Sequence, residues 1–262
     1  MPYTFHTDPK KKWDQQYKVT KNHIVPFLKE SIEFNHDLRI MEIGCGEGGV
    51  LKAFLEEGCR CYGVDISPTR VENARRFFDE DIQAGKISFF VGDVRDKSQY
   101  GDLFGHVDLV VLKDAIEHIF DQVDFLKAVR SFLSPRGYAF LGFPPWPNPF
   151  GGHQQLADSF LKYVPWFHLL PRSAYRNTLK LCGENERKIE ALLEIYDTGL
   201  TIRSFENILK RSGWQTTKRQ FYLLNPIYEY KFGIKGRKQF GLIAGIPLLR
   251  DFFSTGVYYV VR

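Results

Sequence analysis

Residues 39–50 read Arg-Ile-Met-Glu-Ile-Gly-Cys-Gly-Glu-Gly-Gly-Val. This stretch begins as a short apolar strand with an acidic residue, Glu42, near its end, and it continues into a glycine-rich turn. Glycine has no Cβ, so the backbone of such a turn can approach a ligand closely. Gly44, Gly46 and Gly49 also satisfy the G-x-G-x-x-G pattern of dinucleotide-binding proteins. The stretch alone therefore leaves two cofactor classes open, a nicotinamide or flavin dinucleotide and S-adenosylmethionine.

Short apolar runs recur along the chain and are separated by segments of helical length and pattern. Strands that alternate with helices are typical of βαβ units, so we predict an α/β fold with a doubly wound, mostly parallel sheet. We expect strands at 38–43, 61–66, 87–94, 108–114, 137–143, 214–223 and 255–262, and helices at 13–32, 50–57, 67–84, 121–133 and 204–211. Ser67 before Pro68 predicts the start of the helix at 67–84, and Gly85 predicts its end.

The length of 262 residues and the apolar content suit one large domain with an insertion, because no shift in composition marks a second domain. We expect a single domain over 1–262 with four parts. These are N-terminal helices over 1–35, a cofactor-binding core over 36–143, a helical lid inserted after the fifth strand over 144–200, and the C-terminal strands over 201–262.

The net charge and the absence of targeting signals in the sequence argue against some classes of protein. The 36 Lys and Arg residues against 31 Asp and Glu residues give a net charge of +5, far below that of a dedicated nucleic-acid-binding protein. No window approaches the roughly 20 apolar residues that span a bilayer, and no signal peptide is evident, so we expect a cytoplasmic protein. The four cysteines form no Cys-x-x-Cys pair, so we predict reduced thiols and neither a metal site nor a disulfide framework. The sequence indicates no oligomeric state.

Acidic residues at the ends of the first three predicted strands help to separate the two cofactors. Ligands of open parallel sheets bind at the carboxyl ends of the strands. Glu42 would repel a pyrophosphate but suits a ligand with a positive amino group. Asp65 follows the glycines by about 20 residues, where a carboxylate accepts ribose hydroxyls in both cofactor classes. Asp93 could accept the exocyclic amine of adenine while the Val94 backbone N–H donates to the ring, which favours S-adenosylmethionine.

With these residues together, the chain resembles the class I S-adenosylmethionine-dependent methyltransferases, in particular the small-molecule group that includes the quinone-biosynthesis methyltransferases. The matching segments are 42–48, 64–67, 92–94 and 108–119, and the resemblance covers about residues 36–143. It implies seven strands in the order 3-2-1-4-5-7-6, with the cofactor along the ends of strands one to four.

The resemblance also implies a role for individual residues. It implies that the amino-acid end of the cofactor lies at Glu42, Gly44 and Gly46, the ribose at Asp65, the adenine at Asp93, Val94 and Ile66, and the methionyl side at Lys113 and Asp114. Lys113 departs from the uncharged residue expected at its position. A lysine there would be repelled by a sulfonium, so we expect it to point toward the cofactor's carboxylate or toward the substrate.

Two histidines are candidates for a general base, which methyl transfer needs only when the nucleophile is protonated. His153 follows the proline- and glycine-rich loop 144–152 and could reach a substrate hydroxyl; alternatively, it is a loop histidine in solvent or bonded to the backbone. His118 follows Glu117, and a buried histidine satisfied by its neighbours is the alternative there.

Aromatic residues outside the predicted core allow two interpretations each. Trp13 and Tyr17 could close over the cofactor or pack in an amphipathic helix. An apolar substrate pocket or simple packing of the lid would explain Phe160, Tyr163, Trp166 and Phe167. The stretch 228–250 mixes aromatic and basic residues, so it could stack bases, bind a phosphate-bearing substrate or contact an anionic membrane; alternatively, it is a solvated connection.

The sequence therefore predicts an enzyme that transfers a methyl group from S-adenosylmethionine to an oxygen or carbon of a small, apolar or aromatic molecule. An RNA or protein methyltransferase is an alternative, which the modest charge disfavours. The Asn-Pro-Pro-Tyr type of motif of nucleic-acid amine methyltransferases is also missing after the fourth strand, where residues 113–116 read Lys-Asp-Ala-Ile. A nicotinamide-dependent oxidoreductase and a cofactor-binding protein without catalysis are the further alternatives.

Overall fold

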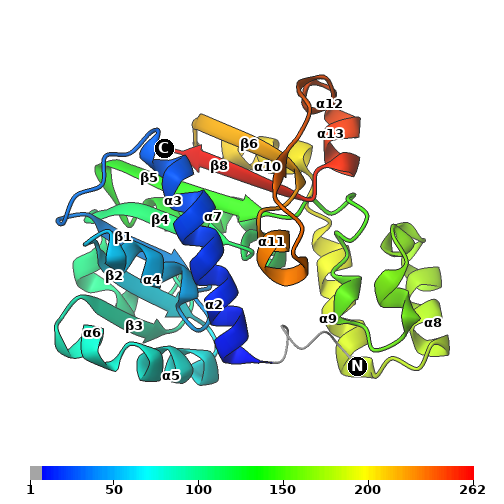
Figure 1. Ribbon diagram of the computed structural model, residues 1–262, viewed down its shortest axis with the longest axis horizontal. Coiled ribbons are helices and arrows are strands. Elements are labelled where there is room, and N and C mark those ends of the chain that lie inside the picture. The colour runs from blue at the N-terminus through cyan, green and yellow to red at the C-terminus, as the bar shows by residue number, and fades with distance from the viewer. Residues whose placement is uncertain (1–7) are drawn as a thin grey trace.

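The strands of the computed structural model, which describes residues 8–262, form one eight-stranded sheet in the order β3-β2-β1-β4-β5-β8-β6-β7 (Figure 1). The strands are β1 (Arg39–Ile43), β2 (Arg60–Asp65), β3 (Ile87–Val91), β4 (Val107–Lys113), β5 (Leu133–Phe143), β6 (Thr216–Leu224), β7 (Arg237–Lys238) and β8 (Gly256–Val261). The first five are parallel, whereas β8, β6 and β7 each run antiparallel to their neighbours.

This sheet confirms the predicted α/β class and the doubly wound arrangement, but the predicted count of seven strands is wrong. The eighth strand, β7, has two residues and pairs with β6 inside the stretch expected to be a loop. The seven predicted strands keep their expected order, because β8 lies between β5 and β6. Residues 1–7 of the predicted N-terminal helical segment lie outside the described residues.

Alternating residues of the central strands supply two buried clusters, one for each face of the sheet. In β1, for example, Met41 belongs to one cluster and Ile40 to the other. One face is covered by α2 (Pro9–Val19), the π-helix η1 (Thr20–Ile24), α3 (Val25–Lys29), α4 (Gly49–Glu56) and α5 (Pro68–Phe77). The other face is covered by α7 (Gln122–Arg130) and α10 (Ile202–Arg211). Single-turn helices in the connections are η2 (Lys97–Gln99), η3 (Gly101–Leu103) and η4 (Ile116–His118).

The helix predicted over 67–84 is two helices, α5 and α6 (Asp79–Gln83), because the chain leaves the helical conformation at Phe78. The Phe78 ring packs against Phe89 of β3 at 5.5 Å between ring centroids, so tertiary packing explains the break. Both predicted boundaries hold: the Ser67 side chain accepts a hydrogen bond from the Arg70 backbone N–H, and Gly85 after the second helix has a φ of +68°.

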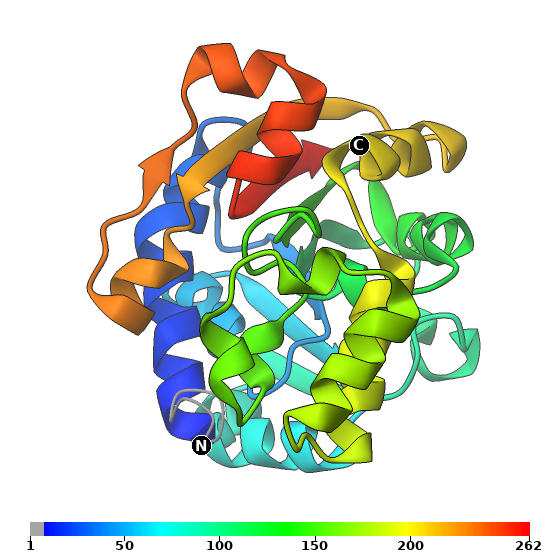
Figure 2. The same ribbon diagram turned by 90° about the vertical axis from the view of Figure 1, so that its right-hand side faces the viewer.

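The segment 144–200 lies beyond the carboxyl ends of the parallel strands, and Figures 1 and 2 show it at that edge of the sheet. Its elements are η5 (Gln154–Leu156), η6 (Phe160–Tyr163), η7 (Phe167–Leu169), α8 (Arg172–Leu181) and α9 (Glu186–Thr198). A separate cluster of buried residues holds these elements together, including Tyr175, Leu179 and Leu192. We call this segment the insertion.

The connection between β6 and β8 is mostly helical and contains α11 (Ile227–Phe232), α12 (Gly241–Gly245) and α13 (Pro247–Phe253). The first of these packs on the N-terminal helix, where the Gln15 side chain donates to the Tyr230 carbonyl at 3.2 Å and Asn22 donates to the Tyr230 hydroxyl at 2.8 Å. Among the described residues 8–262, no helix is both long enough and apolar enough to cross a membrane.

Candidate functional site

The glycine turn after β1 is shaped by backbone conformations that side chains disfavour. Gly44 and Gly46 have φ of +75° and +53°, in the left-handed region. A Cβ on Gly44 would lie 3.2 Å from the Ala115 Cβ, whereas a Cβ on Gly46 would meet no atom within 4 Å. The Gly44 N–H donates to the Val64 carbonyl of β2 at 2.8 Å, which fixes the turn to the sheet. The turn therefore presents a rigid backbone beside open space.

Glu42 of β1 lines a pocket beside this turn, although its residue surface is only 2 % exposed. Its Oε2 atom has no hydrogen-bond partner among the described residues. Burial raises the pKa of the Glu42 carboxyl well above its ordinary value, and the nearby Lys113 opposes that shift. A buried carboxyl with an unused oxygen at a pocket wall is suited to bind a cationic group, because such a group would supply the missing partner.

Asp65 at the end of β2 is held in place by two backbone donors. Its Oδ2 accepts from the Gly46 N–H at 2.8 Å, and its Oδ1 accepts from the Ser67 N–H at 2.9 Å. Each oxygen retains a lone pair for a ligand hydroxyl. The next side chain, Ile66, is 76 % exposed and offers an apolar surface beside this carboxylate. This arrangement fits the predicted contacts with a ribose and an adenine ring.

Asp93 after β3 has a partner that sequence reasoning missed. The Arg95 guanidinium binds its carboxylate in bidentate fashion, with Nε at 3.0 Å from Oδ1 and Nη2 at 2.5 Å from Oδ2. This guanidinium lowers the pKa of the Asp93 carboxyl. The side chain of the neighbouring Val94 is buried. The Asp-x-Arg spacing is the sequence signal that could have revealed the pair.

Lys113 and Asp114 at the end of β4 pair with each other. Lys113 Nζ lies 2.5 Å from Asp114 Oδ2, and the Lys113 side chain is buried while Asp114 remains partly exposed. The predicted orientation of Lys113 toward a cofactor carboxylate or a substrate stays a prediction, since its ammonium here contacts the adjacent carboxylate. Asp114 has a φ of +52°, a conformation that non-glycine residues rarely adopt and that recurs at functional sites.

Three further cations surround the same pocket region and were not singled out for it from the sequence. The Lys12 Nζ atom of α2 lies 4.0 Å from Glu47 Oε2, and both Lys12 and Arg70 of α5 line the pocket. Lys231 of α11 is close enough to Asp114 for the two charges to interact, and burial lowers the pKa of Lys231 to about 8. Clustered basic residues before Trp13 and in the stretch 228–250 were the only sequence signals for two of them.

The two candidate bases, His118 and His153, lie side by side in the connections that follow β4 and β5. Their ring centroids are 5.5 Å apart at an interplanar angle of 41°. His153 has a φ of +54°, so its backbone is strained at the point where the side chain projects. The surrounding protein lowers the pKa of His118, mainly through desolvation, which favours a neutral imidazole. The structure thus brings together two residues that are 35 positions apart in the sequence.

Glu117 beside this pair is buried, and neither of its carboxylate oxygens has a hydrogen-bond partner within residues 8–262. Burial raises the pKa of the Glu117 carboxyl well above its ordinary value, and the negative charge of Asp114 adds to the effect. Its backbone carbonyl accepts from the Thr198 hydroxyl of α9 at 2.7 Å, which links this loop to the insertion. A buried carboxyl with a raised pKa was not among the candidates from sequence.

The aromatic candidates separate into two groups. Trp13 lines the pocket, and its backbone oxygen would lie 2.3 Å from a Cβ on Gly49, so only glycine fits beneath α2 at that position. Tyr17 instead donates to Glu56 at 2.8 Å. In the insertion, the structure does not bring the four aromatic candidates into one pocket: three are exposed and one is buried. The exposed residues are Phe160, Tyr163 and Trp166, of which Trp166 donates to the Pro147 carbonyl, and the buried residue is Phe167, which packs on Tyr175.

Comparison with known sequences adds family evidence to this geometry. Residues 41–141 match the family model described as "Methyltransferase domain". The chain is 23 % identical over 215 residues to a "Probable tocopherol O-methyltransferase, chloroplastic" of Oryza sativa subsp. japonica, covering 74 % of this chain and 57 % of the relative. It is 27 % identical over 142 residues to a "Ubiquinone biosynthesis O-methyltransferase" of Azorhizobium caulinodans, covering 48 % of this chain and 54 % of the relative. The chain thus spans little more than half the length of these curated relatives.

Solved structures with the same fold are also methyltransferases. A SAM-dependent methyltransferase from Thermotoga maritima aligns with a TM-score of 0.55 at 14 % identity, covering 98 % of this chain and 96 % of that one. The trans-methyltransferase CalH, solved in complex with SAH, aligns with a TM-score of 0.54 at 18 % identity, covering 95 % of this chain and 57 % of that one. At these identities the likeness shows the fold.

Proposed function

We propose that the chain, which matches the methyltransferase family model over residues 41–141, transfers the methyl group of S-adenosylmethionine to an oxygen or carbon of a small apolar or aromatic molecule. The observation that carries this proposal is the buried Glu42 carboxyl, which has an unused oxygen at the pocket beside the Gly44–Gly46 backbone. The names of the tocopherol and ubiquinone relatives support an O-methyl acceptor of apolar or aromatic character.

The residues at the strand ends fit the cofactor from one end to the other. Glu42 and the glycine turn would bind its amino-acid end, Asp65 its ribose, and the Asp93 loop with Ile66 its adenine. Lys113 and Asp114 would border its methionyl side. When bound, this cofactor would supply an electrophilic methyl group with a neutral thioether as its leaving group, so the protein's main task is to position the nucleophile in a water-poor pocket.

The two adjacent histidines would act on the acceptor side of this pocket. We assign His153 as the general base that takes the proton from an acceptor hydroxyl, because it projects from the rim loop beside His118. His118, which desolvation keeps largely neutral, is the alternative base for the same proton. For a carbon nucleophile, the same imidazoles would deprotonate the acceptor carbon or its activating hydroxyl.

Titration calorimetry separates this proposal from the alternatives. We expect the protein to bind S-adenosylmethionine and its demethylated product, and Glu42→Gln to weaken both. The matched control is Glu56→Gln, whose carboxylate instead pairs with Tyr17 and Lys21 outside the pocket. Binding of NAD without binding of S-adenosylmethionine would contradict the proposal. A screen of quinols, phenols and other apolar acceptors, followed by release of the demethylated cofactor, would then identify the second substrate.

We also propose a cytoplasmic location, which the state of the cysteines supports. Cys45, Cys59 and Cys61 are free and buried, and Cys182 is free and partly exposed. Burial raises the pKa of the Cys59 thiol to about 12, so this thiol is unreactive at neutral pH. Free thiols of this kind are ordinary in a reducing compartment.

A further inference from the structure

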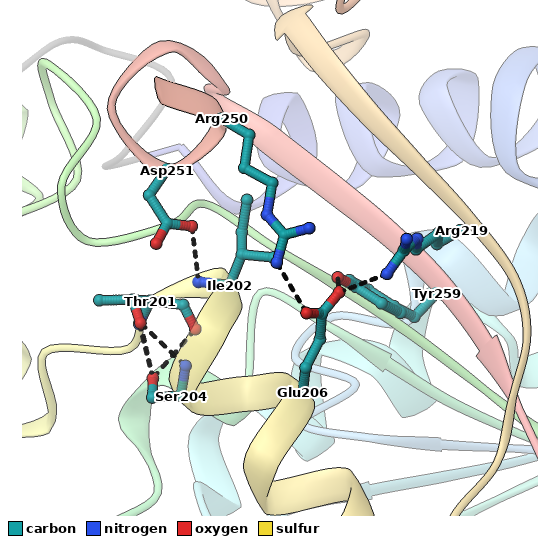
Figure 3. Close-up of polar contacts among 8 residues, drawn as sticks. All are labelled: Thr201, Ile202, Ser204, Glu206, Arg219, Arg250, Asp251 and Tyr259. Carbon is teal, nitrogen blue, oxygen red and sulfur yellow. Dashed lines mark hydrogen bonds and ion pairs between the residues drawn. The ribbon is translucent and has the colours of Figure 1, made fainter. Parts of the chain in front are cut away.

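The helix α13 is attached to the protein through its polar residues. Arg250 is buried and its Nη2 donates to Glu206 Oε2 at 2.7 Å, while Asp251 accepts from the Ile202 N–H at the start of α10 at 3.0 Å (Figure 3). Glu206 also receives the Tyr259 hydroxyl at 3.0 Å and the Arg219 guanidinium at 2.6 Å. These contacts fix α13 against α10 and β8, with its charged side chains directed inward.

Most of the large apolar side chains of the segment 240–253 face outward. Leu242 is 81 % exposed and Leu248 is 70 % exposed, which is unusual for leucines on an ordered helical segment. The exposed large apolar residues of the segment 240–253, which we call the apolar hairpin, are Phe240, Leu242, Ile246, Leu248, Leu249, Phe252 and Phe253. Contiguous exposed apolar side chains of this kind mark an interaction site.

The charge of the neighbouring residues indicates what the apolar hairpin contacts. The sequence from 230 to 250 contains no Asp or Glu, but it contains five Lys and Arg residues. Lys235, Arg237 and Lys238 precede the hairpin and are exposed, and the Arg237 guanidinium lies 4.9 Å from the centre of the Phe240 ring. Exposed leucine and phenylalanine side chains beside exposed basic residues are typical of segments that lie in the interface of an anionic bilayer.

We propose that the apolar hairpin inserts into the surface of an anionic lipid bilayer while Lys235, Arg237 and Lys238 contact the lipid headgroups. The contacts of Arg250 and Asp251 already hold α13 in place. Little conformational entropy of the backbone is therefore lost when its leucine and phenylalanine side chains enter the acyl region of the bilayer. A protein partner would instead require a complementary acidic surface. An anionic bilayer would bind both kinds of exposed residue, because its acyl layer takes up apolar side chains and its headgroups attract cations.

The location of the hairpin adds a consequence for the pocket. The same segment of chain carries Lys231 into the pocket region through α11 and then forms the hairpin, and Figure 2 shows α12, α13 and the insertion on the same side of the molecule. A docked protein would therefore present the carboxyl edge of its sheet toward the bilayer. This inference rests on the surface alone and goes beyond the proposed methyl transfer, which does not require it.

Vesicle flotation of the full chain tests the proposal. The probes are vesicles of phosphatidylcholine alone and of phosphatidylcholine mixed with phosphatidylglycerol, each at low and high salt. We expect binding to the anionic vesicles at low salt, reduced at high salt. The double variant Leu242→Ser and Leu248→Ser should lower the partition constant for vesicles by roughly tenfold or more, since two leucines no longer enter the apolar layer. Lys235→Ala with Lys238→Ala should lower it by roughly fivefold for each charge removed.

Leu181→Ser is the matched control, because this leucine is 88 % exposed at the end of α8 outside the hairpin, and it should bind vesicles like the unchanged protein. Calorimetry with S-adenosylmethionine and thermal unfolding should be the same for all variants, so a failure of docking is distinguishable from a failure of the cofactor proposal. Absence of binding to anionic vesicles at low salt would overturn the inference. So would equal binding by the double leucine variant, or binding of RNA in place of vesicles.

Discussion

The glycine turn and the insertion both lie at the carboxyl edge of the sheet, but different interactions hold them there. The turn is fixed by backbone hydrogen bonds to β2, including the Gly44 N–H to the Val64 carbonyl, and α2 covers it. The insertion packs mainly on its own cluster around Tyr175 and Leu192 and is linked to the sheet by contacts such as Thr198 to Glu117. Cofactor geometry therefore depends on the sheet itself, whereas the acceptor side can change without disturbing it.

The largest effect should come from the acceptor side of this comparison. His153→Ala should lower turnover by roughly 10²–10⁴-fold, the usual contribution of a general base, while the affinity for S-adenosylmethionine stays unchanged. His153→Asn should behave in the same way, and because asparagine tolerates the left-handed backbone, it separates loss of the base from backbone strain. Single-turnover kinetics and calorimetry measure the two quantities. Equal turnover in all three proteins would remove His153 from the mechanism.

The second prediction asks whether the insertion unfolds separately. Leu192→Ala should destabilise the insertion by about 3 kcal/mol, because it leaves a cavity in a small cluster. Hydrogen exchange should then speed up over 144–200 only, and the affinity for S-adenosylmethionine should change little. Leu109→Ala in β4 is the comparison variant and should lower protection across the sheet. If the two variants gave the same exchange pattern, the insertion and the sheet would be one cooperative unit.

The third prediction tests the donor side. Asp65→Ala removes the acceptor for the Gly46 and Ser67 N–H groups together with the expected ribose contact. Affinity for S-adenosylmethionine should fall by roughly thirtyfold, in line with the net loss of one charge-assisted hydrogen bond, and turnover at saturating cofactor should fall much less. Asp93→Ala should cost less, because Arg95 already pairs with that carboxylate. We therefore expect a larger dissociation constant for Asp65→Ala than for Asp93→Ala. The reverse order would contradict the assignment of Asp65 as the stronger cofactor contact.

The smallest effect concerns pH. Since burial raises the pKa of Glu42, this carboxyl holds its proton to a higher pH in the free protein than an ordinary glutamate does, and a bound cationic group would favour the ionised form. Cofactor affinity should therefore rise with pH from about 4.3, the ordinary glutamate pKa, up to the raised pKa, and binding should release a proton. Calorimetry in buffers of different ionisation enthalpy measures that release. Glu42→Gln should abolish the pH dependence and weaken binding by about tenfold; an unchanged pH profile would exclude this role.

The grouping of the residues on the proposed donor side was largely predictable from sequence because its determinants are local. Glu42, the glycines and Asp65 lie within one βαβ unit, and the spacing between them fixes how they meet. Cations from distant elements were not predictable as site residues, because tertiary packing alone brings Lys12 of α2 and Lys231 of α11 to the same pocket region.

Two features of the fold were also beyond pattern reasoning. The break at Phe78 arises from its packing on Phe89, which helical periodicity does not encode. The region of α12 and α13 was expected to be a loop, because large apolar residues there face outward and the usual sign of an amphipathic helix covering a core is missing. The insertion aromatics had no fixed register from sequence, which is why a substrate pocket and simple packing of the lid were both left open for them.

Three residues, Asp114, His153 and Trp166, share a left-handed backbone conformation, and all three follow β4 or β5 in loops at the carboxyl edge. Glycine would adopt that conformation without a steric penalty of about 1 kcal/mol or more for each residue. That non-glycine residues occupy these positions indicates that their side chains make contacts that offset the steric cost of the backbone. At these positions the side chain is kept at a cost in backbone conformation. His153→Gly should relieve that strain and remove the imidazole that we assign as the general base, whereas Asp114→Gly would also leave the buried Lys113 ammonium without its carboxylate partner.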